Sequence, residues 1–142
     1  MTRYFLNTFS WDSWSNYQSL KPPSLGTVRP RDDVQLGDVF LCYVRQEGHV
    51  PGQWVGAERV ISPMYFDDHR YYHVGVWPYR WKVEPAVPRR TYGEGIPGRR
   101  LRDSMRMFAN IDARNWGSAL RTQGREIPAD DGELLIAELS GS

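Results

Sequence analysis

The chain has 142 residues and a mass of 16.5 kDa, enough for one hydrophobic core and too little for two, so residues 1–142 are predicted to form a single domain. Apolar residues make up 40% and charged residues 25%, a balance that argues against a disordered chain. No apolar run approaches the roughly 20 residues of a membrane span, and the first residues lack a signal-peptide pattern, so we expect a cytoplasmic location without a membrane partner. The single cysteine, Cys42, excludes an intrachain disulfide and a cysteine-rich zinc site.

The formal charge of +1 hides an uneven distribution of charge along the chain. Residues 1–69 hold six basic and eight acidic side chains, residues 70–125 hold twelve and four, and residues 126–142 hold none and five. A basic segment between acidic neighbours suits an anionic partner bound on one face, because local potential steers such ligands. The alternative is that many of these arginines are ordinary solvated residues of strands and loops.

The first half of the chain predicts strands and one short helix. Residues 4–8 form an apolar first strand, and Ser10 can cap a helix over 11–20, where aromatic or apolar side chains recur at every third position. Prolines and a glycine in residues 21–26 end this helix. Residues 39–44 and 54–61 then predict two strands joined by a polar loop, which make a hairpin.

The second half adds strands and edge helices. Residues 71–77 and 79–84 are typical of strands, and prolines and glycines then mark a loop over 85–98. Short helices are expected over 99–106, 114–121 and 129–139. About five or six short strands with short flanking helices predict an α+β domain with a small, strongly curved or barrel-like, mainly antiparallel sheet.

The sequence lacks the motifs of several common enzyme classes. There is no phosphate-binding P-loop, no G-x-S-x-G elbow and no H-E-x-x-H zinc motif. Asp67, His69 and His73 could in principle bind a metal, but in an extended segment the two histidines lie roughly 13 Å apart. We therefore predict no catalytic residue, metal or cofactor, with a nucleic-acid-acting enzyme that uses these three residues as a remote alternative.

Aromatic residues are unusually frequent: six tryptophans, eight tyrosines and five phenylalanines. Aromatic faces beside polar groups can stack on an unpaired nucleobase, although core packing explains the same composition. Core positions are predicted for Phe5, Phe40, Tyr43 and Tyr79. Pocket positions are predicted for Trp11, Trp14, Trp54 and Trp116, which lie beside loops or strand ends.

Five segments in this order resemble the EVE domain, and together they span nearly the whole chain. They are Tyr4-Phe5-Leu6-Asn7-Thr8-Phe9-Ser10, Leu36-Gly37-Asp38-Val39-Phe40-Leu41-Cys42-Tyr43, Trp54-Val55-Gly56-Ala57-Glu58-Arg59-Val60, Trp77-Pro78-Tyr79-Arg80-Trp81-Lys82-Val83-Glu84-Pro85, and Asn115-Trp116-Gly117 with Gly124-Arg125-Glu126-Ile127-Pro128. The resemblance implies a PUA-like pseudo-barrel related to YTH and ASCH domains.

The resemblance also implies a reader of modified bases rather than a catalyst. The base would be of the 5-methylcytosine, 5-hydroxymethylcytosine or N6-methyladenine class, in DNA more than in RNA, with any nuclease or other effector as a separate partner. The implied base-binding residues are Thr8, Phe9, Ser10, Trp11, Trp14, Trp54, Asn115, Trp116 and Gln123. The basic segment, rather than the resemblance, predicts that Arg80, Arg114, Arg121 and Arg125 hold phosphates.

One segment departs from the family pattern. Many relatives carry an aromatic residue beside a glycine after the first helix, whereas residues 24–29 here have no aromatic beside Gly26. Either Trp11 or Trp14 replaces it, or the protein binds a different base. A further alternative is a small-molecule or protein-interaction module that uses the same concave face.

Overall fold

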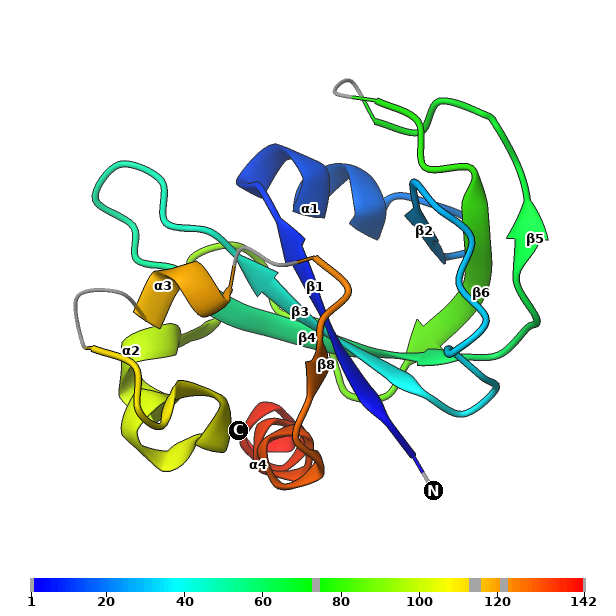
Figure 1. Cartoon of the computed structure of the whole chain (residues 1–142). Coiled ribbons are helices and arrows are strands. Elements are labelled where there is room, and N and C mark those ends of the chain that lie inside the picture. Colours follow the sequence, from blue (N-terminus) through cyan, green and yellow to red (C-terminus); the bar gives the residue numbers. More distant parts are fainter. Residues whose placement is uncertain (1, 73–74, 113–115, 121–122, 142) are drawn as a thin grey trace.

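The computed structural model describes residues 2–72, 75–112, 116–120 and 123–141, without the side chains of Trp116 and Ser118. Six strands form a continuous curled sheet in the order β2-β6-β4-β3-β1-β8, while β5 pairs with β6 and β7 with β4. The strands are β1 (Tyr4–Phe9), β2 (Ser24–Thr27), β3 (Val39–Val44), β4 (Gln53–Val60), β5 (Tyr65–Phe66), β6 (Tyr79–Pro85), β7 (Ile96–Pro97) and β8 (Glu126–Ile127). Figure 1 shows the sheet curving around α1.

Strand pairing is antiparallel except between β1 and β3, which run parallel with Tyr4 opposite Val39 and Phe9 opposite Val44. A bulge between Cys42 and Tyr43 shifts the register of β3 against β4. Bulges increase local twist, so this one helps the sheet to curl. The arrangement is the α+β domain with a curved, mainly antiparallel sheet that the sequence predicted, and it agrees with the pseudo-barrel that the resemblance implied.

The helices lie at the sheet's two faces and at one end. The elements are α1 (Trp11–Gln18), α2 (Gly98–Leu101), the 3₁₀ turns η1 (Arg102–Ser104) and η2 (Arg106–Phe108), α3 (Trp116–Ala119) and α4 (Ala129–Ser140). Ser10 caps α1, since its hydroxyl oxygen accepts the backbone N–H of Ser13 at 3.1 Å. At the start of α4, the buried carboxylate of Asp131 accepts the backbone N–H groups of Arg106 and Met107, both at 2.7 Å, which fixes the α2–η2 segment to this helix.

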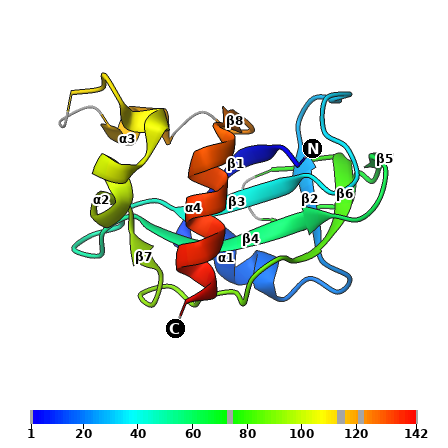
Figure 2. The same cartoon turned by 90° about the horizontal axis from the view of Figure 1, so that it is seen from below.

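Each face of the sheet has its own apolar core. Inside the curl, Trp14 and Tyr17 of α1 pack against Phe9 and the neighbouring strands. On the other face α4 crosses β3 and β4, as Figure 2 shows, and buries Leu135 and Leu139. The position of α1 inside the curl therefore decides which part of that side stays open to solvent.

Two segments differ from the sequence prediction. Residues 24–27, expected to be a break, form β2 against β6. Residues 71–77, expected to be a strand, contribute among their described residues a single bridge between Tyr72 and Gly75. None of the helices in the described ranges is long and apolar enough to cross a bilayer.

Candidate functional site

A pocket of about 600 Å³ opens inside the curl, where β1 ends and α1 begins. This volume lies in the range of small-molecule and cofactor sites. Its walls come from β1, the first turn of α1, β2, the end of β3, the segment before β6 and the turn before β8. The lining residues are Asn7, Thr8, Phe9, Ser10, Ser13, Leu25, Gly26, Arg45, Tyr72, Trp77 and Gln123.

One side of the pocket is built from amide and hydroxyl groups at the end of β1. Gln123 reaches back to β1, where its carbonyl oxygen accepts the N–H of Thr8 at 2.7 Å and its amide N–H donates to the side-chain oxygen of Asn7. Thr8 donates its hydroxyl to the carbonyl of Leu120 at 2.6 Å. Gly124, at φ +78°, turns the chain so that Gln123 faces β1, and its own N–H donates to Leu6. These polar groups are therefore held in place before any ligand binds.

Trp77 and Tyr72 supply aromatic groups to the pocket from the segment before β6. Their ring centroids are 5.3 Å apart at an interplanar angle of 89°, an edge-to-face contact. Tyr72 is buried, whereas Trp77 is only partly buried. Trp77 is therefore the described tryptophan that a ligand in this pocket can touch.

Arg80 holds the Trp77 segment against β2 from beneath the pocket. Its guanidinium donates to the carbonyl of Trp77 at 3.0 Å and to the carbonyl and hydroxyl oxygens of Ser24 at 3.0 and 2.9 Å, and it lies 4.5 Å from the ring centroid of Tyr71. A side chain on Gly26 would place its Cβ 2.5 Å from this guanidinium and 2.6 Å from the Trp77 carbonyl. The missing side chain at Gly26 therefore allows this close approach.

The rim carries hydroxyl groups and one cation. Ser10 donates its hydroxyl to that of Ser13 at 2.9 Å. Arg45 follows β3 directly, its side chain is exposed, and its backbone N–H donates to Phe9 at 3.0 Å. Arg45 forms no ion pair with any residue in the described ranges. The pocket thus combines an aromatic wall, an amide-rich side and a guanidinium at the opening.

Several of the predicted base-binding residues line this pocket. They are Thr8, Phe9, Ser10 and Gln123. Trp11 lies outside the lining, 45% exposed and against Tyr92 at a centroid distance of 5.7 Å.

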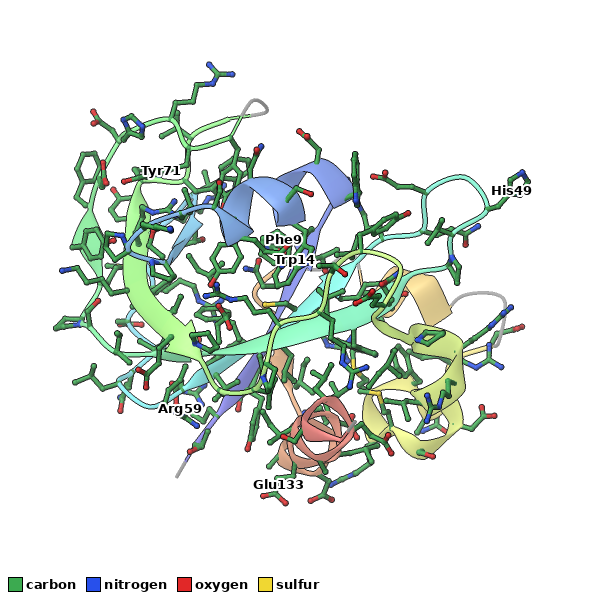
Figure 3. All side chains as sticks on the ribbon, turned by 180° about the vertical axis from the view of Figure 1, so that it is seen from behind. Phe9, Trp14, His49, Arg59, Tyr71 and Glu133 are labelled. Carbon is green, nitrogen blue, oxygen red and sulfur yellow. The ribbon has the colours of Figure 1, made fainter. Side chains whose placement is uncertain are left out.

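Trp14 and Trp54 do not line the pocket, because both are fully buried. The indole N–H of Trp14 donates to the carbonyl of Arg90 at 3.0 Å, and Figure 3 shows this side chain beneath α1 next to Phe9. Trp54 packs edge-to-face on Tyr43 in the core of the opposite face. These two tryptophans are core residues.

The predicted phosphate-binding arginines have different outcomes. Arg80 is fully buried and cannot reach a phosphate, so its role is to hold the pocket wall. Arg125 is half-buried, with a contact to the carbonyl of Ala119 at 3.5 Å. Arg114, Arg121 and Asn115 lie outside the described residues, as does the side chain of Trp116, whose backbone begins α3.

The sequence reasoning missed seven of the lining residues: Asn7, Ser13, Leu25, Gly26, Arg45, Tyr72 and Trp77. Two of them carried a signal. Asn7 is an amide residue in a strand whose other residues, apart from Thr8, are apolar or aromatic. Trp77 precedes Pro78 and follows Gly75 by two residues, a composition more typical of a structured loop than of a central strand.

The residues of the enzymatic alternative are engaged in structural contacts. Asp67 accepts the hydroxyl of Tyr71 at 2.5 Å and the N–H of His69 at 2.9 Å, and the Tyr71 hydrogen bond lowers the pKa of this carboxyl. His73 lies outside the described residues. Within the described ranges no three metal-binding side chains gather, and burial raises the pKa of the Cys42 thiol.

A glycine pattern near β7 also has a structural explanation. Residues 93–98 match the G-x-G-x-x-G spacing of dinucleotide-binding turns. Here the N–H groups of Gly93 and Gly95 both donate to the side-chain oxygen of Gln53, at 2.9 and 2.8 Å. These groups are therefore satisfied within the protein, and the turn does not follow the strand of a βαβ unit.

Comparison with known proteins places this pocket in a recognisable fold. No protein-family model matches the chain, and no curated protein matches its sequence. Solved structures do match. The Pho92 YTH domain in complex with m6A aligns with a TM-score of 0.67 at 13% identity, covering 99% of this chain and 85% of that one.

Two further structures extend the comparison. The YTH domain of Zygosaccharomyces rouxii MRB1, in complex with N6-methyladenosine RNA, has a TM-score of 0.66 and 14% identity, covering 98% of this chain and 87% of that one. Human THYN1, in complex with 5-methylcytosine-containing DNA, has a TM-score of 0.58 and 8% identity, covering 99% of each chain. The chain therefore has the PUA-like fold of YTH and EVE domains.

Proposed function

We propose that this protein is a non-catalytic reader that holds one extruded modified nucleobase in the pocket between β1 and the Trp77 segment. The observation that carries the proposal is the pocket itself: about 600 Å³, with a partly buried indole on one wall and fixed amide groups on another. Aromatic stacking and edge-directed hydrogen bonds are the two contacts that recognise an unstacked base.

Structures of the same fold support this choice of ligand, since they were solved with N6-methyladenosine in RNA and with 5-methylcytosine in DNA. In this chain the base would stack on Trp77, while the side chains of Asn7, Thr8 and Gln123 would read its edge. Arg45 at the opening would contact a phosphate of the same strand. The departure noted around Gly26 is thereby accounted for, because Trp77 supplies the aromatic wall from a different segment.

Selectivity for the modification is expected to be moderate. Burying one methyl group contributes about 0.8 kcal/mol, which is about fourfold in affinity. A wet cavity or an unpaired polar group beside the unmodified base would raise the preference, to about 100-fold at most. Titration of matched oligonucleotides with and without N6-methyladenine or 5-methylcytosine measures this preference, and deoxy and ribo versions of each decide which polymer is bound.

The decisive variant is Trp77→Ala. Loss of a base-stacking indole should weaken binding of the modified oligonucleotide by about 1–3 kcal/mol. The matched control is Phe66→Ala, which removes an aromatic side chain outside the pocket, 64% exposed on β5. If Trp77→Ala binds the modified oligonucleotide with wild-type affinity, the base does not bind in this pocket. Binding with no dependence on salt would favour a neutral small-molecule ligand instead.

A further inference from the structure

A second aromatic surface lies beside the pocket, at the first residue of α1. Trp11 is 45% exposed, and its ring is supported by Tyr92 at a centroid distance of 5.7 Å and an interplanar angle of 56°. Its backbone N–H donates to the carboxylate of Glu47 at 3.3 Å. These contacts fix the residue while much of the indole remains open to solvent.

The position of Trp11 is continuous with the rim of the pocket. Ser10, the preceding residue, lines the pocket and caps the helix. Arg45 also lines the pocket, and its backbone is bonded to Phe9 at 3.0 Å. Glu47, two residues after Arg45, is the residue that contacts Trp11. One short stretch of surface therefore joins the pocket opening to the indole.

Helix geometry separates Trp11 from the pocket interior. At about 3.6 residues per turn, residues two positions apart lie on nearly opposite sides of a helix. Ser13 faces the pocket, so Trp11 projects from the other flank of the first turn. The indole cannot share the base held in the pocket, but it lies where the strand would continue past Ser10 and Arg45.

We propose that Trp11, supported by Tyr92, is a stacking platform for the base next to the one in the pocket, and that the ligand is consequently an unpaired strand. In a duplex, the base next to an extruded one stays paired and stacked on its far side, and its one open face lies inside the helix. An indole at the pocket rim therefore stacks on the neighbouring base only when the strand is unpaired. This inference rests on the proposed function. The two are tested separately because the pocket alone binds a nucleoside, whereas the platform needs a strand.

The experiment compares a modified nucleoside with a short single-stranded oligonucleotide that carries the same base at its centre. The probes are N6-methyladenosine and 5-methyl-2′-deoxycytidine. Trp11→Ala should leave nucleoside affinity unchanged and weaken oligonucleotide binding about tenfold, as expected for one stacked base. Phe66→Ala is the matched control, because Phe66 is also an exposed aromatic that packs on a tyrosine, at 5.6 Å, and it lies on a strand at the far edge of the sheet (Figure 1).

An abasic position next to the modified base completes the test. When the base that reaches the platform is removed from the oligonucleotide, the wild-type protein should lose as much affinity as the Trp11→Ala substitution costs with the intact oligonucleotide. The Trp11→Ala variant should bind the intact and the abasic oligonucleotide equally well. If the affinity loss from Trp11→Ala adds to the loss from an abasic site on either side of the modified base, the platform proposal is wrong. Equal loss of nucleoside and oligonucleotide binding would also overturn it. If wild-type protein binds neither probe, the proposed function fails, and the platform fails with it.

Discussion

At the scale of single residues, burial separates tryptophans that the sequence could not tell apart. Trp54 and Trp77 both lie near turns and polar residues, but Trp54 is fully buried while Trp77 lines the pocket. Local composition does not show on which face of a curled sheet a side chain lies. The aromatic excess therefore predicted an aromatic pocket wall without identifying Trp77 as the tryptophan that lines the pocket.

Trp54→Ala should lower the free energy of unfolding by about 3–5 kcal/mol, because it leaves a large cavity in the core. Trp54 packs on the face of the sheet opposite the pocket, so the protein that remains folded should bind a modified oligonucleotide with wild-type affinity. Denaturant unfolding and titration at a temperature well below the melting transition measure the two effects. A marked affinity loss in the fully folded variant would show that Trp54 communicates with the ligand.

Arg80→Lys should weaken ligand binding although Arg80 touches no ligand. An ammonium group cannot reproduce the planar fork that joins the Trp77 carbonyl to Ser24, so Trp77 should lose its fixed position. We expect stability to fall by about 1–3 kcal/mol and affinity to fall about tenfold, as expected for a disrupted aromatic stack. Trp54→Ala serves as the control, since it loses more stability without losing affinity. Equal affinities for the two variants would assign Arg80 a purely structural role.

At the scale of elements, strong periodic segments were predictable and short ones were not. The sequence located β1, β3, β4, β6 and α4 within a few residues. It missed β2, which directly follows Pro22 and Pro23 and contains Gly26. The strand character of β2 comes from pairing with β6 rather than from its own composition. Residues 71–77 were predicted as a strand because they are rich in aromatic and β-branched residues, which are typical of strands. Tyr72 and Trp77 instead line the pocket.

The placement of α1 depends on a buried ionic contact that no sequence pattern indicated. The Tyr17 hydroxyl donates to the carboxylate of Glu58 on β4, and the Arg89 guanidinium donates to the same oxygen at 2.8 Å. Glu58 is fully buried. Three segments distant in sequence meet here, and they fix the helix that carries Ser10 and Ser13 at the pocket.

This contact predicts a pH dependence of stability. Burial raises the pKa of Glu58, against the opposing effects of Arg89 and Tyr17. The folded state therefore holds the Glu58 proton more tightly than the unfolded state, so the stabilisation is complete below the usual glutamate range and is lost as pH rises through the raised pKa. The unfolding free energy of wild type, relative to Glu58→Gln, should fall as pH rises above the usual glutamate range. Urea titrations across this range measure it, and a widening advantage of wild type would contradict the prediction.

At the scale of the whole molecule, the near-zero net charge says little about ligand binding, because several cations are already used inside the protein. Arg80 and Arg89 hold internal contacts, and Arg90 donates to carbonyls at the end of α4, including Gly141 at 3.0 Å. The basic segment of the sequence therefore supplies structure as well as surface charge. Arg45, from a segment of net negative charge, is the described arginine that lines the pocket.

Arg45→Gln should weaken the binding of modified and unmodified oligonucleotides by the same factor, because a phosphate contact does not depend on the base. Loss of one phosphate contact should also reduce the slope of log affinity against log salt by about 0.7–0.9. The matched control is Arg59→Gln, an exposed arginine on β4 that projects away from Phe9 in Figure 3 and lies 3.9 Å from Glu84. This control should keep the wild-type slope. If Arg45→Gln changes the preference for the modified base while the salt slope stays constant, Arg45 contacts the base itself, and the strand must enter the pocket from another side.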